Sequence, residues 1–172
     1  EGIHFPFSHV EMMAHFDKTI ELQMNKMSTA SIINRWWDCF LASMRGTLAD
    51  QIKVGRDLKL EGDNLYFNFT SCYNRVSRQW YVQYRDSAPA KGVMMDSLKK
   101  DKAWVDAISG VRFAPGRDSK ATSAYQVNLQ QIPISDEIKF AVDFQVHENS
   151  LFPSPATPEE KNNDKDAEEL PF

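Results

Sequence analysis

The side chains able to perform covalent or acid-base chemistry are few in this sequence, and their spacing does not suit such chemistry. His9 and His15 flank Glu11, but a separation of six residues does not put two side chains on one face of a helix. Cys39 and Cys72 cannot complete a four-ligand zinc site, and neither has a basic partner close in the sequence. The sequence contains no P-loop and no GxSxG motif. We therefore expect a protein that is not an enzyme, with no metal site and no cofactor.

Clustered basic side chains are the chemistry that the sequence does offer. Residues 75–120 contain 10 basic and 5 acidic side chains, which gives this segment a net charge of +5. Residues 1–74 contain 7 basic and 9 acidic side chains, and residues 121–172 contain 3 basic and 10 acidic ones. The whole chain therefore has a net charge of -4. A local positive segment attracts phosphate if folding gathers its charges on one face. The acidic average thus conceals a candidate binding surface.

Two helices are expected at the start of the chain. Ser8 followed by Glu11 is a capping box that opens an apolar series at helical spacing, which predicts a helix over residues 9–26. Ser28 or Thr29 then predicts the start of a second helix, which ends near Gly46. Its wide apolar face is expected to be core rather than a ligand site, and it consists of Ile32, Ile33, Trp36, Trp37, Phe40, Leu41 and Met44. The Met-rich first helix is left with two alternatives, packing on its own core or on a second chain.

A hairpin and a third helix are expected next. Apolar residues alternate with polar ones in a pattern that predicts strands over residues 53–60 and 65–70, joined by the turn residues 61–64. From Ser71 the apolar period changes from that of a strand to that of a helix. The region therefore predicts a β-hairpin followed directly by a helix.

The basic segment itself predicts a short helix and a second hairpin. An amphipathic pattern covers residues 91–100, and β-prone runs at 111–113 and 122–129 are joined by the polar turn 114–120. A helix, a turn, a helix and a hairpin with a basic tip is the order of a winged helix. We therefore expect an α+β fold, namely a winged-helix-like domain with extra N-terminal helices and two β-hairpins.

This expected order assigns a role to the basic residues. In a helix-turn-helix the second helix enters the major groove of DNA while flanking elements contact phosphates. A projecting hairpin can follow the phosphate backbone or enter a minor groove. The candidate DNA-binding residues are Arg75, Arg78, Lys91, Ser97, Lys99, Lys100, Arg112, Arg117 and Lys120. The alternative is that these residues are solvated surface charges with no partner.

Length and composition limit the organisation of the chain. Its 172 residues suffice for one ordinary core, and we expect a single globular winged-helix-like domain over residues 1–152. Residues 153–172 contain four prolines and an acidic run, so we expect an acidic, proline-containing disordered tail. No segment approaches the roughly 18 consecutive apolar residues of a membrane helix, so no membrane partner is expected. Two cysteines that make no disulfide framework favour a cytoplasmic protein.

A family resemblance is carried by the order and spacing of several segments between about residues 20 and 130. The segments are Ile33-Asn34-Arg35-Trp36-Trp37, the hairpin that begins Gly55-Arg56-Asp57-Leu58-Lys59-Leu60, Tyr81-Val82-Gln83-Tyr84-Arg85, Met95 to Lys100, and Val111-Arg112-Phe113 followed by Thr122-Ser123-Ala124-Tyr125. In these segments the chain resembles the C-terminal region of primase- and helicase-like replication proteins of bacterial mobile elements and prophages. None of the segments is a catalytic motif, so primase or helicase activity is not implied for this chain.

The resemblance implies an accessory domain that lies downstream of an ATPase or primase domain of the same chain and helps it to hold DNA. The first residue is Glu1 rather than Met, which agrees with a piece of a longer protein. The leading hypothesis is therefore a non-enzymatic DNA-binding or DNA-positioning domain, with duplex DNA favoured over single strands. The alternative is a protein-protein interaction module of a replication or mobile-element complex.

Overall fold

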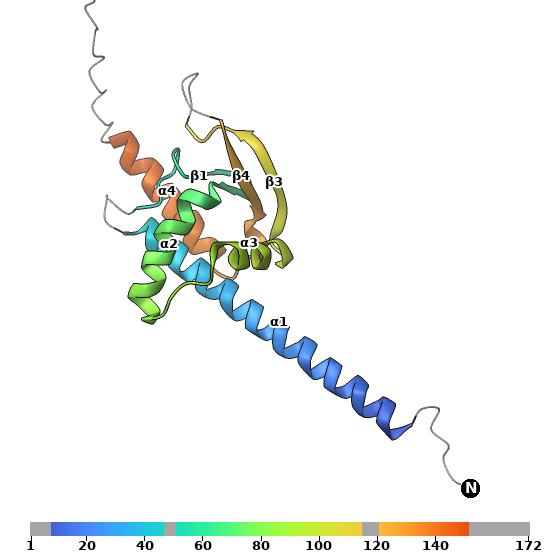
Figure 1. Ribbon diagram of the computed structural model, residues 1–172. Helices are drawn as coiled ribbons and strands as arrows, with labels where there is room; N and C mark the ends of the chain where they lie inside the picture. The colour runs from blue at the N-terminus through green and yellow to red at the C-terminus, as the bar shows by residue number, and fades with distance from the viewer. Residues whose placement is uncertain (1–7, 47–50, 115–120, 152–172) are drawn as a thin grey trace, which may run out of the picture.

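Four α-helices and four strands make up the fold in the computed structural model, which describes residues 8–46, 51–114 and 121–151. The elements in chain order are α1 (His9–Met44), β1 (Leu58–Glu61), β2 (Asn64–Phe67), α2 (Phe69–Tyr84), α3 (Lys91–Lys100), β3 (Trp104–Val111), β4 (Thr122–Asn128), the short 3-10 helix η1 (Leu129–Gln131) and α4 (Ser135–Leu151) (Figure 1). The expected α+β class is confirmed. None of the described helices is both long and apolar enough to cross a bilayer.

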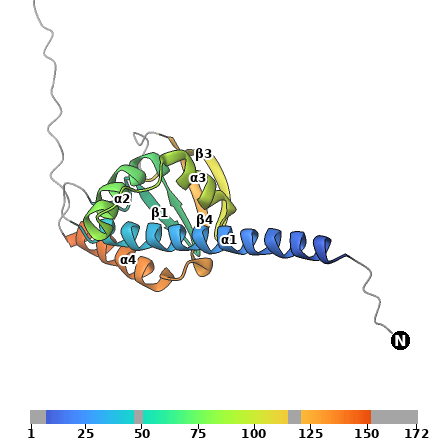
Figure 2. The same ribbon diagram turned by 60° about the horizontal axis from the view of Figure 1, so that its bottom comes forward.

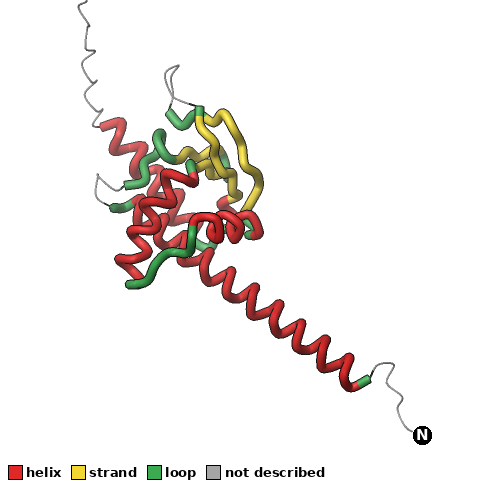
Figure 3. Tube along the Cα trace, viewed as in Figure 1, coloured by secondary structure: helices red, strands yellow, loops and turns green. Residues whose placement is uncertain are grey.

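The four strands form one antiparallel sheet in the order β1-β2-β4-β3. Both expected hairpins are present, β1 with β2 and β3 with β4. β2, which precedes α2, pairs with β4, which follows α3, so Phe67 lies opposite Tyr125 across the two strands. The described helices lie to one side of this sheet (Figure 3). The sheet therefore joins the first hairpin to the second through its two central strands.

The first helix differs from its prediction, because α1 is one continuous helix of 36 residues rather than two. Ser8 caps it as expected, accepting a hydrogen bond from the Glu11 amide while the Glu11 carboxylate accepts one from the Ser8 amide. Ser28 and Thr29 have helical backbone and do not start a new helix. The sequence from His9 to Arg45 contains neither glycine nor proline, so nothing interrupts the helix.

Other boundaries shift for local reasons. The expected strand over residues 65–70 ends at Phe67, because the Asn68 side chain accepts a hydrogen bond from the Ser71 amide and starts α2 two residues before Ser71. The β3 strand begins at Trp104, seven residues before the predicted start, and two register shifts interrupt its alternation. The expected tail, residues 153–172, lies outside the described residues, as does most of the turn 114–120.

Aromatic side chains form the centre of the core, as the wide apolar face of residues 32–44 predicted. Trp36 and Trp37 are each only 1% exposed, and Phe40 is fully buried. The Trp37 and Phe40 rings make edge contacts with Phe67 of β2 at 6.0 and 5.6 Å between centroids. These contacts place the sheet directly against the C-terminal half of α1, and α4 packs beside the same half (Figure 2).

A buried carboxylate links the loop before β1 to α2. Asp57 is 2% exposed, and its Oδ2 atom accepts hydrogen bonds from the Lys53 amide at 3.0 Å and from Arg56 at 2.6 and 2.9 Å. Its Oδ1 atom accepts from Ser71 at 2.6 Å and from Arg75 at 3.2 Å. Burial alone would raise the pKa of Asp57, but these hydrogen bonds and the charge of Arg56 outweigh it and hold the pKa below the ordinary value of 3.8.

Asp57→Asn is expected to lower the free energy of unfolding by about 3 kcal/mol at neutral pH, because the arginines and Ser71 lose a shared buried anion. Because the folded-state pKa is depressed, the carboxylate stabilises the protein above the unfolded-state pKa of 3.8 and ceases to do so as the pH falls through the lower folded value. Urea unfolding of both proteins should therefore show a difference at pH 7 that shrinks in acid below pH 4, a window set by that depressed pKa.

A matched control is Asp63→Asn, since the Asp63 carboxylate also pairs with a cation, Lys139 at 3.0 Å, but its side chain is 46% exposed. This substitution should cost about 1 kcal/mol or less. Equal losses for the two variants would contradict the role assigned to Asp57.

Candidate functional site

The outward face of α3 is the first part of the candidate site. Met94 and Leu98 of this helix are buried in the core, so the opposite face is turned to solvent. Asp96, Lys99 and Lys100 are exposed, and both lysines occupy the last turn. Positive charge at that end is favourable because the last carbonyl groups of a helix carry partial negative charge. The two lysines thus lie at the end of a helix whose opposite face is packed in the core through Met94 and Leu98.

The other two α3 residues of the predicted site lie away from this outward face. Lys91 is exposed, but its Nζ atom donates a hydrogen bond to the Thr70 hydroxyl at 3.0 Å, which ties the start of α3 to the start of α2. Ser97 is half-buried at the edge of the packed face. Lys91 and Ser97 therefore flank the site, while Lys99 and Lys100 form it.

Arg75 is committed to the interior of the protein. Its Nη1 atom donates hydrogen bonds to the Ser71 hydroxyl at 2.6 Å and to Asp57 at 3.2 Å, and its side chain is 19% exposed. The guanidinium thus neutralises a buried carboxylate, and a contact to a phosphate would compete with that pairing. Arg78, one turn further along α2, is exposed. Arg75 is therefore not part of the exposed basic surface, and Arg78 is exposed on α2 rather than on α3.

The second hairpin carries the next of the predicted residues, at the end of β3 that is remote from α3. Arg112 follows the last residue of β3 and is exposed, whereas its neighbours Val111 and Phe113 are buried in a small cluster with Ala124. This packing holds the backbone on either side of Arg112, so its position is set by the fold. Arg117 and Lys120, which were expected at the tip, lie outside the described residues.

Lys102 is a basic residue that the sequence reasoning missed. It is exposed in the three-residue connection between α3 and β3, directly after the lysines of the last turn. Asp101 beside it accepts a hydrogen bond from the Ala103 amide at 2.8 Å, which fixes this connection. The signal in the sequence was the run Lys99-Lys100-Asp101-Lys102. In the ribbon view α3 lies at the base of the β3–β4 hairpin (Figure 1), so Lys102 lies beside the α3 lysines and at the opposite end of β3 from Arg112.

The two thiols are buried and free. Burial, together with the charge of Asp38, raises the pKa of Cys39 to about 12, and burial raises the pKa of Cys72 well above its usual value. Cys39 also donates a hydrogen bond to the Gln83 side chain at 2.9 Å. Within the part of the chain that the structure describes, no three His, Cys, Asp or Glu residues gather as metal ligands would.

Arg75→Gln is expected to lower the free energy of unfolding by about 2 kcal/mol, because it removes charged hydrogen bonds to a buried anion. Lys99→Gln is the matched control and should change stability by about 0.5 kcal/mol or less, since Lys99 is exposed. Urea unfolding at neutral pH measures both values. If Arg75→Gln is as stable as the wild type, Arg75 is not needed to neutralise Asp57 and remains a candidate DNA-binding residue.

The chain matches no family model, no curated protein and no solved structure. The roles of Lys99, Lys100, Lys102 and Arg112 therefore rest on their own geometry and charge. That geometry brings Lys99, Lys100 and Lys102 together at the end of α3 and in its connection to β3. Arg112 lies at the other end of β3, eight residues or roughly 25 Å along the strand from Trp104.

Proposed function

We propose that this chain is a DNA-binding or DNA-positioning domain of the winged-helix type, which binds duplex DNA without catalysing a reaction. The observation that carries the proposal is the strand pairing around α2 and α3. β2, the strand before α2, pairs with β4, the last strand after α3. This pairing joins α1, β2, α2, α3 and the β3–β4 hairpin into one unit. A winged helix has this order, with α3 as its recognition helix and the β3–β4 hairpin as its wing.

The exposed basic side chains support this proposal. Lys99, Lys100 and Lys102 lie where α3 turns into β3, and Arg112 lies at the end of the first hairpin strand. The three lysines at the base of the hairpin and Arg112 at its far end would contact different phosphate groups, and phosphate contacts supply most of the affinity of a DNA-binding domain. Phosphate contacts also position a protein without reading sequence, which fits a positioning role.

The middle of α3 has a different chemistry from its end. Gly92 begins the outward face, and a side chain added there would meet no atom within 4 Å, so this part of the helix is open to close approach. Asp96 is exposed on the same face and would repel a phosphate group. In a major groove, however, a carboxylate accepts a hydrogen bond from the amino group of cytosine. We therefore assign Lys99 and Lys100 to the backbone and the start of α3 to the groove.

The proposal extends to an accessory role beside an ATPase or primase domain in a mobile-element replication protein. This part rests on the resemblance of the segments between about residues 20 and 130 to the C-terminal region of such proteins. An isolated domain with about four phosphate contacts binds weakly at physiological salt, so it would act together with such a neighbour.

The proposal is tested by fluorescence anisotropy of the full chain with labelled duplex and single-stranded DNA over a salt series. The wild type should bind duplex DNA more tightly, with a slope of log affinity against log salt near -0.9 per phosphate contacted. Lys99→Glu combined with Lys100→Glu should weaken binding by roughly tenfold or more and make the slope shallower by about 2.

The matched control is Lys18→Glu, which reverses an exposed lysine on the N-terminal half of α1. Its affinity should stay within about twofold of the wild type, since α1 is outside the proposed surface. Absence of duplex binding by the wild type at low salt would refute the DNA proposal. Equal weakening by the control would show that total charge, rather than this surface, governs binding.

A second candidate function, a protein-interaction module, is favoured by the exposed phenylalanines of α4. Phe140 is 67% exposed and Phe144 is 60% exposed, one turn apart on the same helix. Large exposed apolar groups mark protein-binding surfaces more often than DNA-binding ones. This function predicts partner binding that survives Lys99→Glu and is lost in Phe140→Ser.

A further inference from the structure

The N-terminal half of α1 projects from the body of the protein. Both ribbon views show the helix leaving the helices and the sheet, with no other described element beside its first turns (Figures 1 and 2). Ile33 is the first buried residue of the helix. The projecting half nevertheless carries large exposed apolar side chains, namely Val10, Met12, Met13, Phe16, Ile20, Leu22, Met24 and Met27. The cost of leaving so many apolar groups in water indicates a missing partner.

Five of these residues form one narrow stripe. Met13, Phe16, Ile20, Met24 and Met27 follow one another at spacings of three or four residues, and at 100° per residue they fall within an arc of about 80°. We call these five residues the α1 stripe. Its ends are about 21 Å apart along the helix, at 1.5 Å per residue.

The stripe faces away from the body of the same chain. On the continuous helix, the buried residues Ile33, Trp36, Phe40 and Met44 centre on a direction roughly opposite to that of the stripe. The core that covers the C-terminal half therefore cannot extend along the helix to cover the stripe. Any partner of the stripe must approach from the other side.

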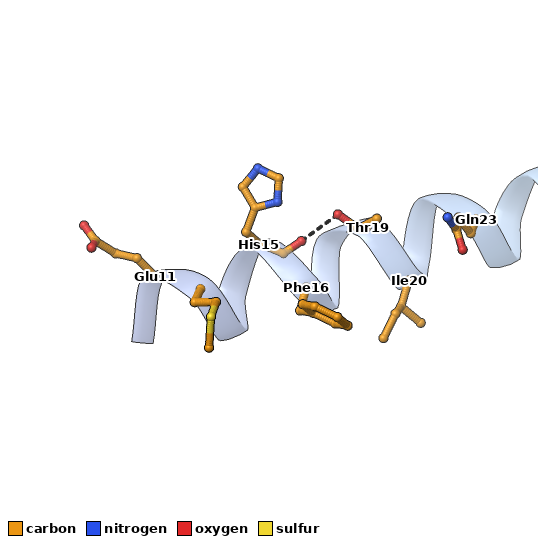
Figure 4. Close-up of a pocket in the computed structure, with 7 residues that line it drawn as sticks. Glu11, His15, Phe16, Thr19, Ile20 and Gln23 are labelled. Atoms are coloured by element: carbon orange, nitrogen blue, oxygen red, sulfur yellow. Dashed lines mark hydrogen bonds between the residues drawn. The ribbon is translucent and has the colours of Figure 1, made fainter. Parts of the chain in front are cut away.

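The close-up view shows two residues of the stripe together with residues on its flank. Phe16 and Ile20 project from one side of the helix, while His15 projects from the opposite side (Figure 4). The hollow that these side chains line is formed only by residues of α1, so it is an open helix face rather than an enclosed pocket. An open face of this length fits another helix better than a small molecule.

We propose that the α1 stripe pairs with the α1 stripe of a second copy, with the two helices parallel. A stripe of five apolar residues on one helix is complementary to an identical stripe related by a twofold axis. The exposed fractions of the five residues, between 47% and 74%, correspond to roughly 600 Å² of surface at about 200 Å² for a large side chain. Flanking residues such as Met12 bring this close to the roughly 800 Å² per partner that a stable interface buries.

Charge on the flanks of the stripe decides the orientation. Asp17 and Glu21 lie along one flank, whereas Thr19 and Gln23 lie along the other. In an antiparallel pair the acidic flank of one helix would face the acidic flank of its partner. In a parallel pair each acidic flank faces the neutral flank of the other helix. Like charges on facing helices are destabilising, so the parallel arrangement is favoured.

The self-association is tested by sedimentation equilibrium of the full chain over about a hundredfold range of concentration. The wild type should change from monomer to dimer within that range. Ile20→Glu places a charge at the centre of the stripe and should weaken the dimer by roughly a hundredfold or more. Ile20 is already 47% exposed in the single chain, so circular dichroism should show an unchanged fold.

The matched control is Leu22→Glu, because Leu22 is an apolar residue on the same helix, 53% exposed, but on the opposite face. This variant should dimerise as the wild type does. A wild type that stays monomeric at the highest concentration would overturn the proposal. A Leu22→Glu variant that loses the dimer as completely as Ile20→Glu would also overturn it, since the stripe would then not be the interface.

Disulfide trapping distinguishes the two orientations. Met13→Cys should form a disulfide-linked dimer under mild oxidation only in a parallel pair, where the two copies of position 13 meet. In an antiparallel pair centred on Ile20, position 13 faces position 27, about 21 Å from its own copy. Ile20→Cys is the positive control, because it cross-links in either orientation. Cross-linking of Ile20→Cys without Met13→Cys would refute the parallel arrangement. The native thiols of Cys39 and Cys72 are buried and do not interfere.

Discussion

The carboxylate of Asp57 is the constraint on which the rest of the fold depends. A charge removed from water is tolerated only if every lone pair finds a donor, and Asp57 obtains its donors from two separate elements. The Lys53 amide and Arg56 come from the loop before β1, and Ser71 and Arg75 come from the first two turns of α2. The β1–β2 hairpin is thereby fixed at both ends, by the loop before β1 and by the start of α2. Its second strand, β2, is the one that pairs with β4.

This arrangement explains why basic residues divide into two groups that the sequence does not separate. Arg75 and Lys99 are equivalent in a charge count, and both belong to the segment with a net charge of +5. The fold brings a carboxylate 18 positions earlier in the chain against Arg75 and leaves Lys99 in solvent. Whether a cation neutralises an internal anion or an external one depends on contacts between distant segments, which local patterns do not contain.

The elements that local patterns did predict are those with a clear capping or turn signal or a clear apolar periodicity. The capping box of Ser8, the turn at Gly62 and the amphipathic pattern of residues 91–100 each specify their structure within a few residues. The missed features lack such signals. Ser28 or Thr29 could cap a helix only if the residues before it were not helical, and in α1 those residues are helical. The α4 helix was not predicted, although Ile138, Ala141, Val142 and Gln145 are buried at helical spacing. Apolar residues such as Phe140 and Phe144 also occupy its exposed face, so the sequence of α4 lacks a clear apolar stripe.

The continuity of α1 fixes a rotational relationship between its two halves. The helix is about 54 Å long, and its N-terminal and C-terminal apolar faces belong to one rigid rod without a hinge residue. One residue inserted between these faces would rotate one against the other by about 100°, whereas seven residues would restore the relation to within about 20°. The length of the segment around Ser28 therefore sets an angle as well as a distance. Whatever the projecting end binds, the helix transmits that orientation to the aromatic core, and through the core to α3.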